Sequence, residues 1–315
     1  MQFRQLGRSG VRVSQVGLGT DQFGPRVDRA ATARIVGAAL EAGINFFDTA
    51  DIYSLGESES YLGAALQGHR HEVVIATKAG RPFGKGTNDA GSSRTHLVRA
   101  LEASLVRLGT DYVDLYQIHI YDPTTPMDEL MRTLDDMVSS GKVRYLGASN
   151  FSAWQVCRCN DIAEAQGRAP FVTVQPHYHL LEREVEREML PYCRMFGVGV
   201  LPYFPLAAGV LTGRYTQAGA PPADSRSAVG GWQLDYVNRY RTPENWARLE
   251  SLTAWAAERG HTLADLAIAW LLGEPLVPSV IAGASKAEHV TANAAAGDWA
   301  LTADEMAAVR AILEG

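Results

Sequence analysis

The sequence predicts an α/β fold, a (β/α)8 TIM barrel with an N-terminal β-hairpin and extra C-terminal helices. Short apolar runs alternate with helical patterns from about Val16 to the end of the chain. The runs number eight and lie at residues 15–19, 44–48, 73–78, 112–118, 143–148, 171–175, 198–203 and 278–282. Eight strands in this alternation favour a closed parallel barrel. Because no linker, repeat or low-complexity tract interrupts the pattern, we expect one domain over residues 1–315.

Three segments depart from the alternation. Residues 2–14 read as two short strands around Gly7-Arg8-Ser9-Gly10, which predicts the hairpin. Residues 81–91 are rich in Gly, Pro and Asn and predict a mobile loop on the catalytic rim. Residues 212–243 form a longer loop after the seventh strand. A loop of that length inside a compact domain is usually functional, so we expect it to fold over a ligand.

Several helices between the strands have recognisable starts. After the fourth strand, Thr125 is expected to cap a helix, Pro126 to take its first position, and Asp128 to complete a capping-box-like pair. Ser93 and Ser152 are expected to cap the helices that they precede. These starts support the strand–helix alternation.

The composition is that of a globular protein. Hydrophobic residues make up 46% of the chain and charged residues 20%, which allows a sizeable core and argues against disorder. A net charge of −6 gives no electrostatic reason to expect nucleic acid or an anionic membrane as a partner. No run approaches the roughly 20 apolar residues of a membrane helix. Three cysteines without framework spacing, and no signal peptide, predict a cytoplasmic protein with reduced thiols; the oligomeric state stays open.

Four chemically active side chains stand at or just after strand ends. Asp48 closes the second predicted strand, Tyr53 follows in the same loop, Lys78 closes the third strand and His119 follows the fourth. In a barrel of this type the carboxyl ends of all strands meet at one rim, where catalysis is found. We therefore expect these four residues to gather there.

A phenol, an ammonium, a carboxylate and an imidazole can transfer a proton to a carbonyl oxygen. Free tyrosine, with a pKa of about 10, holds its proton too tightly near neutrality, and a nearby cation lowers that pKa. Lys78 can supply the cation if Asp48 anchors it, and His119 can polarise the carbonyl. This predicts an oxidoreductase with a bound hydride carrier and Tyr53 as its general acid or base. The alternative is an ion pair of Asp48 and Lys78 beside two ordinary loop residues.

The residues also indicate where an anionic cofactor could bind. Gly17-Leu18-Gly19 is a weak dinucleotide signal because Gln22 stands where a third glycine belongs. A better anion site is Gly283-Ala284-Ser285-Lys286, which follows the eighth strand and opens a helix. Ser285 and Glu288 there would form a capping box. Alternatively, Ser285 merely caps its helix and Lys286 is solvated.

Two other groups of residues carry no catalytic expectation. His177 and His179 lie near a strand end, but no carboxylate–histidine cluster with metal-site spacing accompanies them. We expect structural histidines and no metal. Cys157 and Cys159 have one residue between them, which is the wrong spacing for a redox pair.

Three motifs resemble those of the aldo-keto reductase superfamily, and most closely those of bacterial members that are similar to potassium-channel β-subunits. The first runs from Gly43 to Tyr53 and continues as Gly56-Glu-Ser-Glu-Ser-Tyr-Leu-Gly63. The second is Leu105-Val-Arg-Leu-Gly-Thr-Asp-Tyr-Val-Asp-Leu-Tyr-Gln-Ile-His119, and the third is Gly141-Lys-Val-Arg-Tyr-Leu-Gly-Ala-Ser-Asn-Phe-Ser152. The likeness extends over nearly the whole chain.

This resemblance implies a catalytic tetrad and a nicotinamide site. The tetrad corresponds to Asp48, Tyr53, Lys78 and His119. The cofactor residues implied are Thr20, Asp48, Ser149, Asn150, Gln175, Tyr203, Phe204, Pro205, Leu206, Arg214, Arg226, Gly283, Ser285, Lys286, His289 and Asn293. Residues expected to border the substrate are Phe23, Tyr53, His119, Tyr121 and Trp232. Asp21, where an aromatic or hydrophobic residue is common, suggests a polar pocket.

The resemblance favours NADP(H) as the cofactor and leaves NAD(H) open. Ala292 replaces a frequent acidic residue and His289 stands where Gln or Arg is often found, so Lys286 alone argues for a 2′-phosphate. The function predicted is reduction of an aldehyde or ketone to an alcohol. The alternatives are an oxidative aldose or alcohol dehydrogenase, a nicotinamide-binding regulatory subunit and, more remotely, a metal-dependent hydrolase.

Overall fold

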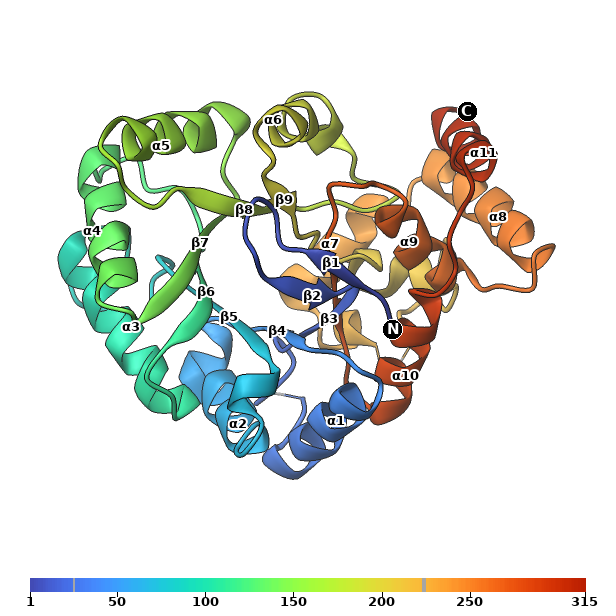
Figure 1. Ribbon diagram of the computed structural model, residues 1–315. Coiled ribbons are helices and arrows are strands. Elements are labelled where there is room, and N and C mark those ends of the chain that lie inside the picture. The colour runs from blue at the N-terminus through green and yellow to red at the C-terminus, as the bar shows by residue number, and fades with distance from the viewer. Residues whose placement is uncertain (25, 223–224) are drawn as a thin grey trace.

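The computed structural model describes residues 1–24, 26–222 and 225–315. Eight parallel strands form one curled sheet with helices around its outside (Figure 1), as predicted. The strands are β3 (Val16–Gly19), β4 (Phe46–Asp48), β5 (Val74–Ala79), β6 (Val113–Ile118), β7 (Val143–Ser149), β8 (Phe171–Gln175), β9 (Gly199–Val200) and β10 (Val280–Gly283). Their spatial order is β10-β3-β4-β5-β6-β7-β8-β9, so each strand from β3 to β9 lies beside the next in the chain.

The two ends of this order, β9 and β10, are joined by backbone hydrogen bonds rather than by a regular ladder. Val200 N donates to Leu276 O at 2.8 Å, and Ile281 N donates to Pro202 O at 3.3 Å. The seventh strand was predicted over residues 198–203, but β9 ends at Val200. Pro202 explains part of the difference, because proline has no N–H to donate to a neighbouring strand.

The helices pack on the outer face of the sheet and at its C-terminal end. They are α1 (Arg29–Glu41), α2 (Glu57–Ala65), α3 (Arg94–Leu108), α4 (Met127–Ser139), α5 (Ala153–Ala165), α6 (Met189–Phe196), α7 (Gly231–Tyr240), α8 (Pro243–Ala257), α9 (Leu263–Leu272), α10 (Ala287–Ala296) and α11 (Ala303–Glu314). Short 3-10 turns are η1 (Tyr53–Gly56), η2 (Arg70–Glu72), η3 (Glu184–Glu186), η4 (Ala207–Thr212) and η5 (Arg226–Val229).

The predicted helix starts are confirmed in two cases and wrong in a third. Ser93 accepts a bond from His96 N at the start of α3, and Ser152 forms a capping box at the start of α5. Thr125 does not cap α4, because its hydroxyl donates to the Asp122 carboxylate at 2.6 Å. A nearby acceptor has therefore taken the side chain that would have capped the helix.

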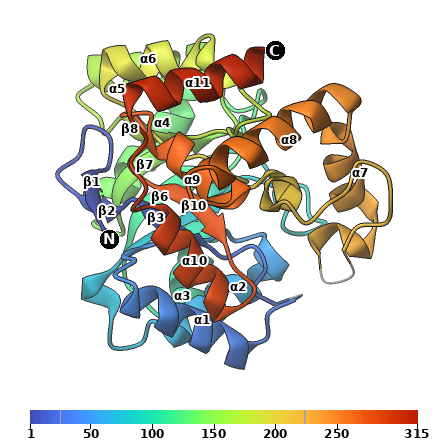
Figure 2. The same ribbon diagram turned by 90° about the vertical axis from the view of Figure 1, so that its right-hand side faces the viewer.

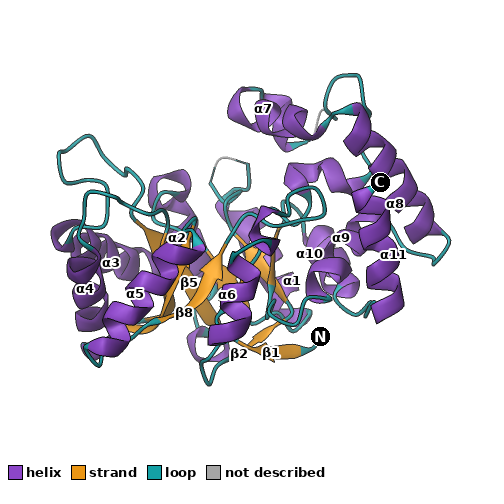
Figure 3. Cartoon of the chain, turned by 90° about the horizontal axis from the view of Figure 1, so that it is seen from above, coloured by secondary structure: helices purple, strands orange, loops and turns teal. Residues whose placement is uncertain are grey.

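The N-terminal hairpin closes one end of the barrel. Strands β1 (Phe3–Gln5) and β2 (Arg12–Ser14) pair antiparallel, and Figures 2 and 3 show them at the end opposite α7. Leu6 and Val13 are fully buried in the core inside the barrel. Gly7 has a φ of +54°, and a Cβ there would lie 2.0 Å from the Val172 carbonyl oxygen. Only glycine lets the turn approach the strands so closely.

The segment predicted as a long loop, residues 212–243, contains regular structure. It includes η5 and α7, and it leads directly into α8. Figure 3 shows α7 beyond the carboxyl ends of the strands. Helix α7 was not predicted because Gly230 and Gly231 stand at its start, and adjacent glycines are typical of loops.

Candidate active site

Strand periodicity explains why polar groups gather at the end of the barrel opposite the hairpin. Phe46, Ala76 and Leu115 belong to the core inside the barrel. Side chains two residues apart on a strand share a face, so Asp48, Lys78 and Gln117 follow them on that inner face in a polar layer. Register pairs Lys78 with Gln117 and Asp48 with Ala76. The barrel interior thus changes from apolar to polar toward the strand ends. The polar layer consists of Asp48, Lys78, Gln117 and Gln175.

Lys78 is the centre of this layer. Its ammonium donates to Asp48 Oδ1 at 2.5 Å, to Thr49 O at 2.8 Å and to Tyr53 Oη at 3.3 Å. The side chains of Lys78 and Asp48 are 0% and 3% exposed, whereas Tyr53 is partly exposed. The ion pair is therefore sealed inside the barrel, and the phenol is the member of this trio that the surroundings can reach.

Asp48 is held by two further donors. Gln117 Nε2 donates to Asp48 Oδ2 at 3.0 Å, and Gln175 Nε2 donates to the same oxygen at 2.8 Å. Gly147 leaves room for this arrangement, because a Cβ there would come within 3.0 Å of the Gln117 side chain. Gln117 was missed by sequence reasoning, and Gln175 was assigned to the cofactor alone. The signal was available, since Gln117 is a polar residue in the same inward phase as the apolar Leu115.

The pKa of Tyr53 is raised rather than lowered. Burial raises the pKa of Tyr53 above its usual value, and the positive charge of Lys78 offsets this only in part because the Asp48 carboxylate acts in the opposite direction. Burial would lower the pKa of Lys78, but the Asp48 charge and the bonds to Asp48 and Tyr53 raise it overall. The expectation of a phenol with a lowered pKa is thus not met in this structure. Tyr53 is a neutral phenol beside a permanent cation.

His119 lies next to Tyr53 and is uncharged. The two rings make an edge-to-face contact with centroids 5.9 Å apart. Burial, together with the charges of Lys78 and Arg81, holds the pKa of His119 well below its usual value. Its Nδ1 atom is buried and has no hydrogen-bond partner in the described part of the chain. Arg81, which sequence reasoning also missed, follows β5 and adds a second positive charge near both Tyr53 and His119.

Tyr53 begins a strained turn. Ser54 and Leu55 have φ values of 50° and 53°, a left-handed conformation that non-glycine residues rarely adopt. The Ser54 hydroxyl donates to Phe23 O at 2.7 Å and so ties the turn to the loop after β3. Strain of this kind persists where the surroundings fix it, commonly at functional sites.

Three residues predicted to hold the nicotinamide end of a cofactor form one hydrogen-bonded chain. Tyr203 Oη donates to Asn150 Oδ1 at 2.9 Å, and Asn150 Nδ2 donates to His119 O at 2.9 Å and Ser149 Oγ at 3.0 Å. Asn150 has a φ of 57°, and its side-chain amide reaches the residue that follows β6. This end of the predicted cofactor site is therefore built directly onto the backbone of the catalytic histidine candidate.

His177 and His179 lie behind Tyr203 in an aromatic cluster. The His177 ring stacks on Tyr203 with centroids 5.1 Å apart and an interplanar angle of 8°. His177 Nε2 hydrogen-bonds Tyr236 of α7 and lies 3.0 Å from His179 Nε2. Burial lowers the pKa of His177 to about 4. The two histidines are thus bound by protein groups and join α7 to the barrel. Among the described residues no three His, Cys, Asp or Glu side chains form a group that could hold a metal.

At the predicted phosphate end, the capping box of Ser285 and Glu288 is wrong. Helix α10 begins at Ala287 with Lys286 as its N-cap, so Glu288 stands one residue too early in the helix to complete the box. Ser285 Oγ instead lies 3.4 Å from His289 Nδ1. Gly283, Lys286 and His289 are exposed, and Ser285 and Asn293 are partly exposed. The helix N-terminus and its lysine are therefore open to a ligand.

The predicted phosphate end follows β10, and other predicted cofactor residues follow its two neighbours, β3 and β9. Thr20 is buried after β3 and its hydroxyl donates to Asp48 O at 3.1 Å. Phe204, Pro205 and Leu206 follow β9, and Phe204 has a φ of 55°. Arg214 is exposed. The side chain of Arg226 lies outside the described residues.

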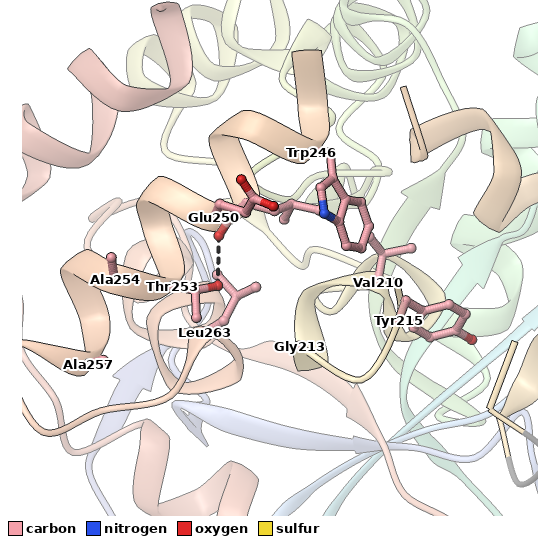
Figure 4. A pocket seen from close by; sticks show the side chains of 10 residues that line it. Val210, Gly213, Tyr215, Trp246, Glu250, Thr253, Ala254, Ala257 and Leu263 are labelled. Atoms are coloured by element: carbon pink, nitrogen blue, oxygen red, sulfur yellow. Dashed lines mark hydrogen bonds between the residues drawn. The ribbon is translucent and has the colours of Figure 1, made fainter. Parts of the chain in front are cut away.

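A cavity of about 350 Å³ lies away from the tetrad, between η4 and helices α8 and α9 (Figure 4). Gly213 and Tyr215 line it together with Trp246 and Leu263, whereas Arg214 between them does not. Its lining is largely apolar. This cavity is therefore separate from the residues predicted to bind the cofactor.

The predicted substrate residues are not all placed as expected. Phe23 is 0% exposed and belongs to the hydrophobic core, because a β-bridge to Val27 turns this segment inward. Tyr121 is partly buried against Phe151 and Trp154, with ring centroids 5.4 and 6.2 Å away. Asp21 lies near the exposed Gly283, where an added Cβ would be 3.6 Å from its carboxylate. The side chain of Trp232 lies outside the described residues.

Comparisons with known proteins identify the family of the chain. The model of the aldo/keto reductase family matches residues 15–314. A probable voltage-gated potassium channel subunit beta of Oryza sativa subsp. japonica is 39% identical, over 95% of this chain and 92% of that protein. The uncharacterized oxidoreductase YrpG of Bacillus subtilis (strain 168) is 38% identical, over 92% and 89%. An aldo-keto reductase of Fusarium vanettenii is 36% identical, over 96% and 88%.

In the described chain, no helix combines the length and the apolar character that crossing a membrane requires. The family model covers nearly all of the chain, and the relatives align along most of their own length. The chain therefore belongs to the aldo/keto reductase family, whose members are nicotinamide-dependent oxidoreductases acting on small carbonyl compounds.

Proposed function

We propose that this protein is an NADP(H)-dependent reductase that converts an aldehyde or ketone to an alcohol, with Tyr53 as the general acid. The observation that carries the proposal is the position of Lys78, whose buried ammonium bonds Asp48 and the hydroxyl of the partly exposed Tyr53 at once. An ordinary rim ion pair would not need a phenol within bonding distance of its cation. The arrangement is that of a proton donor with a fixed neighbour of positive charge.

Each of the four residues has a distinct part in this proposal. Tyr53 donates its proton to the substrate oxygen, and Lys78 stabilises the phenolate that remains. Asp48 keeps Lys78 charged and in place. His119, held neutral by its surroundings, orients the carbonyl oxygen toward the Tyr53 hydroxyl. No step of this mechanism requires His119 to be protonated.

The residues at the strand ends fit a nicotinamide cofactor, which when bound supplies or accepts the hydride. The half-buried Tyr203 ring stacks on His177 and offers an aromatic surface at which a flat ring could stack. Asn150 and Ser149 offer amide and hydroxyl groups beside it. Helix α10 presents its N-terminus and Lys286, the usual elements of a phosphate site. An aromatic face, an amide and a cationic helix end are what such a cofactor requires.

The preference for NADP(H) rests on Lys286 and is testable. Replacing Lys286 with alanine should weaken NADPH binding about 10-fold or more, because an exposed charge pair with phosphate is lost, and should leave NADH binding nearly unchanged. Quenching of tryptophan fluorescence by each cofactor measures both affinities. Lys142→Ala, an exposed lysine on another face of the barrel, is the control. Equal losses for the two cofactors would contradict the assignment of Lys286 to the 2′-phosphate.

The raised pKa of Tyr53 supports the reductive direction. A phenol that keeps its proton through the neutral range is ready to act as an acid, whereas oxidation needs the phenolate. We therefore expect the oxidative rate to increase with pH as the phenol begins to ionise and the reductive rate to stay level near neutrality. An oxidative aldose or alcohol dehydrogenase remains the alternative enzyme.

A nicotinamide-binding regulatory subunit is a second candidate, favoured by the relative named as a potassium channel subunit beta. Such a subunit would bind NADPH without needing turnover. The Lys78–Tyr53 contact argues for the enzyme, because a binding role does not require it. The three free cysteines support a reducing compartment, and we propose the cytoplasm.

The experiment that tests the proposal is a turnover assay. Purified protein is mixed with NADPH or NADH and a panel of aldehydes, ketones and sugars, and cofactor oxidation is followed with and without a chelator. We expect saturable reduction of at least one carbonyl that the chelator does not affect. Tight NADPH binding with no turnover across the panel would favour the regulatory subunit.

A further inference from the structure

A second pocket lies outside the tetrad, between the 81–91 loop and helix α3. Its volume is about 190 Å³, and its side chains include Asp51, Phe83, Asp89, His96, Arg99 and Arg107. Tyr53, Lys78 and His119 do not line it. The pocket therefore belongs neither to the tetrad nor to the residues predicted to bind the cofactor.

Two buried polar side chains in this pocket lack partners. Asp51 is 1% exposed, and neither of its carboxylate oxygens has a hydrogen-bond partner among the described residues. His96 is 4% exposed, and the same holds for its Nε2 atom. Buried polar groups are nearly always hydrogen-bonded, so two of them lining one pocket indicate a bound polar molecule.

Neighbouring charged groups do not meet this need, because they are already engaged. Glu59 is fully buried and accepts from Thr77 Oγ1 at 2.5 Å and from Arg107 Nε at 2.7 Å. Asp89 accepts from Gly86 N at 2.7 Å and lies 3.5 Å from Arg99 Nη2. Arg107 therefore neutralises Glu59 rather than Asp51. The charges of Arg107 and Lys78 lower the pKa of Asp51, but burial and the Glu59 charge raise it by more.

The lining restricts the chemistry of the ligand. The two oxygens of Asp51 require hydrogen-bond donors, whereas the guanidinium groups of Arg99 and Arg107, each partly engaged elsewhere, carry further N–H groups that can donate to a ligand. A simple anion would be repelled by Asp51 and Asp89, and a simple cation would be repelled by the two arginines. A neutral molecule with several hydroxyl groups can donate and accept together, and Phe83 offers its carbon atoms an apolar face. The volume suits a molecule between glycerol and a monosaccharide in size.

We propose that the Asp51–His96 pocket is a second binding site for a small polyhydroxy compound, with the Asp51 carboxylate and the His96 imidazole as its central contacts. This site goes beyond the proposed reductase function and does not depend on it. The 81–91 loop joins the two regions, because it carries Phe83 and Asp89 in the pocket and begins with Arg81, whose charge acts on Tyr53 and His119. A bound polyol would restrain this loop beside the catalytic centre.

The test measures binding without turnover. Xylitol, erythritol and glycerol are titrated separately into the full-length protein, with ligand-observed NMR as the readout. We expect saturable binding of at least one of them, at least 10-fold weaker in His96→Leu and in Asp51→Asn. Tyr53→Phe, altered only at the catalytic centre, should bind as the original protein does. Binding lost in Tyr53→Phe but kept in His96→Leu would place the polyol at the catalytic centre and overturn the proposal.

Two further variants keep the test decisive if a buried substitution impairs folding. Arg99→Ala changes a pocket residue whose side chain is 58% exposed and should weaken xylitol binding. Arg94→Ala, on the same helix but outside the pocket, is the matched control and should not. Binding of guanidinium, Mg²⁺ or inorganic phosphate in place of all three polyols would show the ligand class to be wrong. Saturating xylitol with only water on Asp51 and His96 in a crystal would overturn the site itself.

Discussion

Asp48 and Asp51 are three residues apart at the end of one strand, and both are almost completely buried, yet their surroundings are opposite. Asp48 accepts from Lys78, Gln117 and Gln175. Asp51 has no partner among the described residues, and burial raises its pKa from 3.8 to about 7. The difference teaches that a buried carboxylate is a fixed charge only where donors surround it. Without them its charge depends on pH and on what binds.

The largest expected effect comes from removing the charge that is well surrounded. Asp48→Asn leaves the buried Lys78 ammonium without its counter-charge, and breaking such a pair costs about 3–5 kcal/mol. We also expect turnover to fall at least about 100-fold, because the proton donor loses its fixed neighbour. Chemical denaturation and carbonyl reduction measure the two effects. An Asp48→Asn protein as stable and active as the original would show that the pair has no structural or catalytic importance.

Asp51→Asn should change the free energy of unfolding in the opposite direction and stabilise the protein at high pH. A carboxyl group with a raised pKa in the folded state binds a proton there that the unfolded chain has released, so its contribution to stability falls between about pH 4 and pH 7. The original protein should therefore lose stability over this window. Asp51→Asn should lose less, and near pH 8 should be more stable by about 4 kcal/mol. Denaturation at pH 5 and pH 8 measures this, and parallel pH profiles for the two proteins would refute it.

The smallest effect concerns one of the donors around Asp48. Gln117→Leu removes a buried bond to a charged group and should cost about 1.5–3 kcal/mol. Gln166→Leu is the matched control, because its amide donates to the Asp128 carboxylate at 2.9 Å on the surface, where the loss should be near zero. Urea denaturation of both variants gives the difference. If the two losses were equal, burial would not be what gives the Asp48 bonds their strength.

Much of the fold and the position of the tetrad could be predicted because both depend on short-range patterns. Apolar runs with β-branched residues mark the strands, and a polar residue that ends such a run must lie at a strand end. Asp48, Lys78 and His119 were therefore placed correctly on one rim from the sequence alone. Tyr53 followed because it lies in the loop that Asp48 begins.

What could not be predicted depends on competition between neighbours in space. Thr125 had a capping position in the sequence but a better acceptor in Asp122. Phe23 stood in a loop expected near the substrate, yet it packs into the core. The pKa of Tyr53 depends on the balance of burial, Lys78 and Asp48, and spacing along the chain gives no measure of burial. No sequence pattern distinguishes Asp51 from an exposed loop aspartate.

The most direct test of the central claim compares two tyrosines in a single-turnover experiment. Tyr53→Phe removes the phenol beside Lys78, and Tyr61→Phe removes one on α2, away from the tetrad. With NADPH bound and an aldehyde substrate in excess, we predict that the reduction rate falls at least about 100-fold in Tyr53→Phe and is unchanged in Tyr61→Phe, with NADPH affinity kept in both. Reduction by Tyr53→Phe at the original rate would contradict the account.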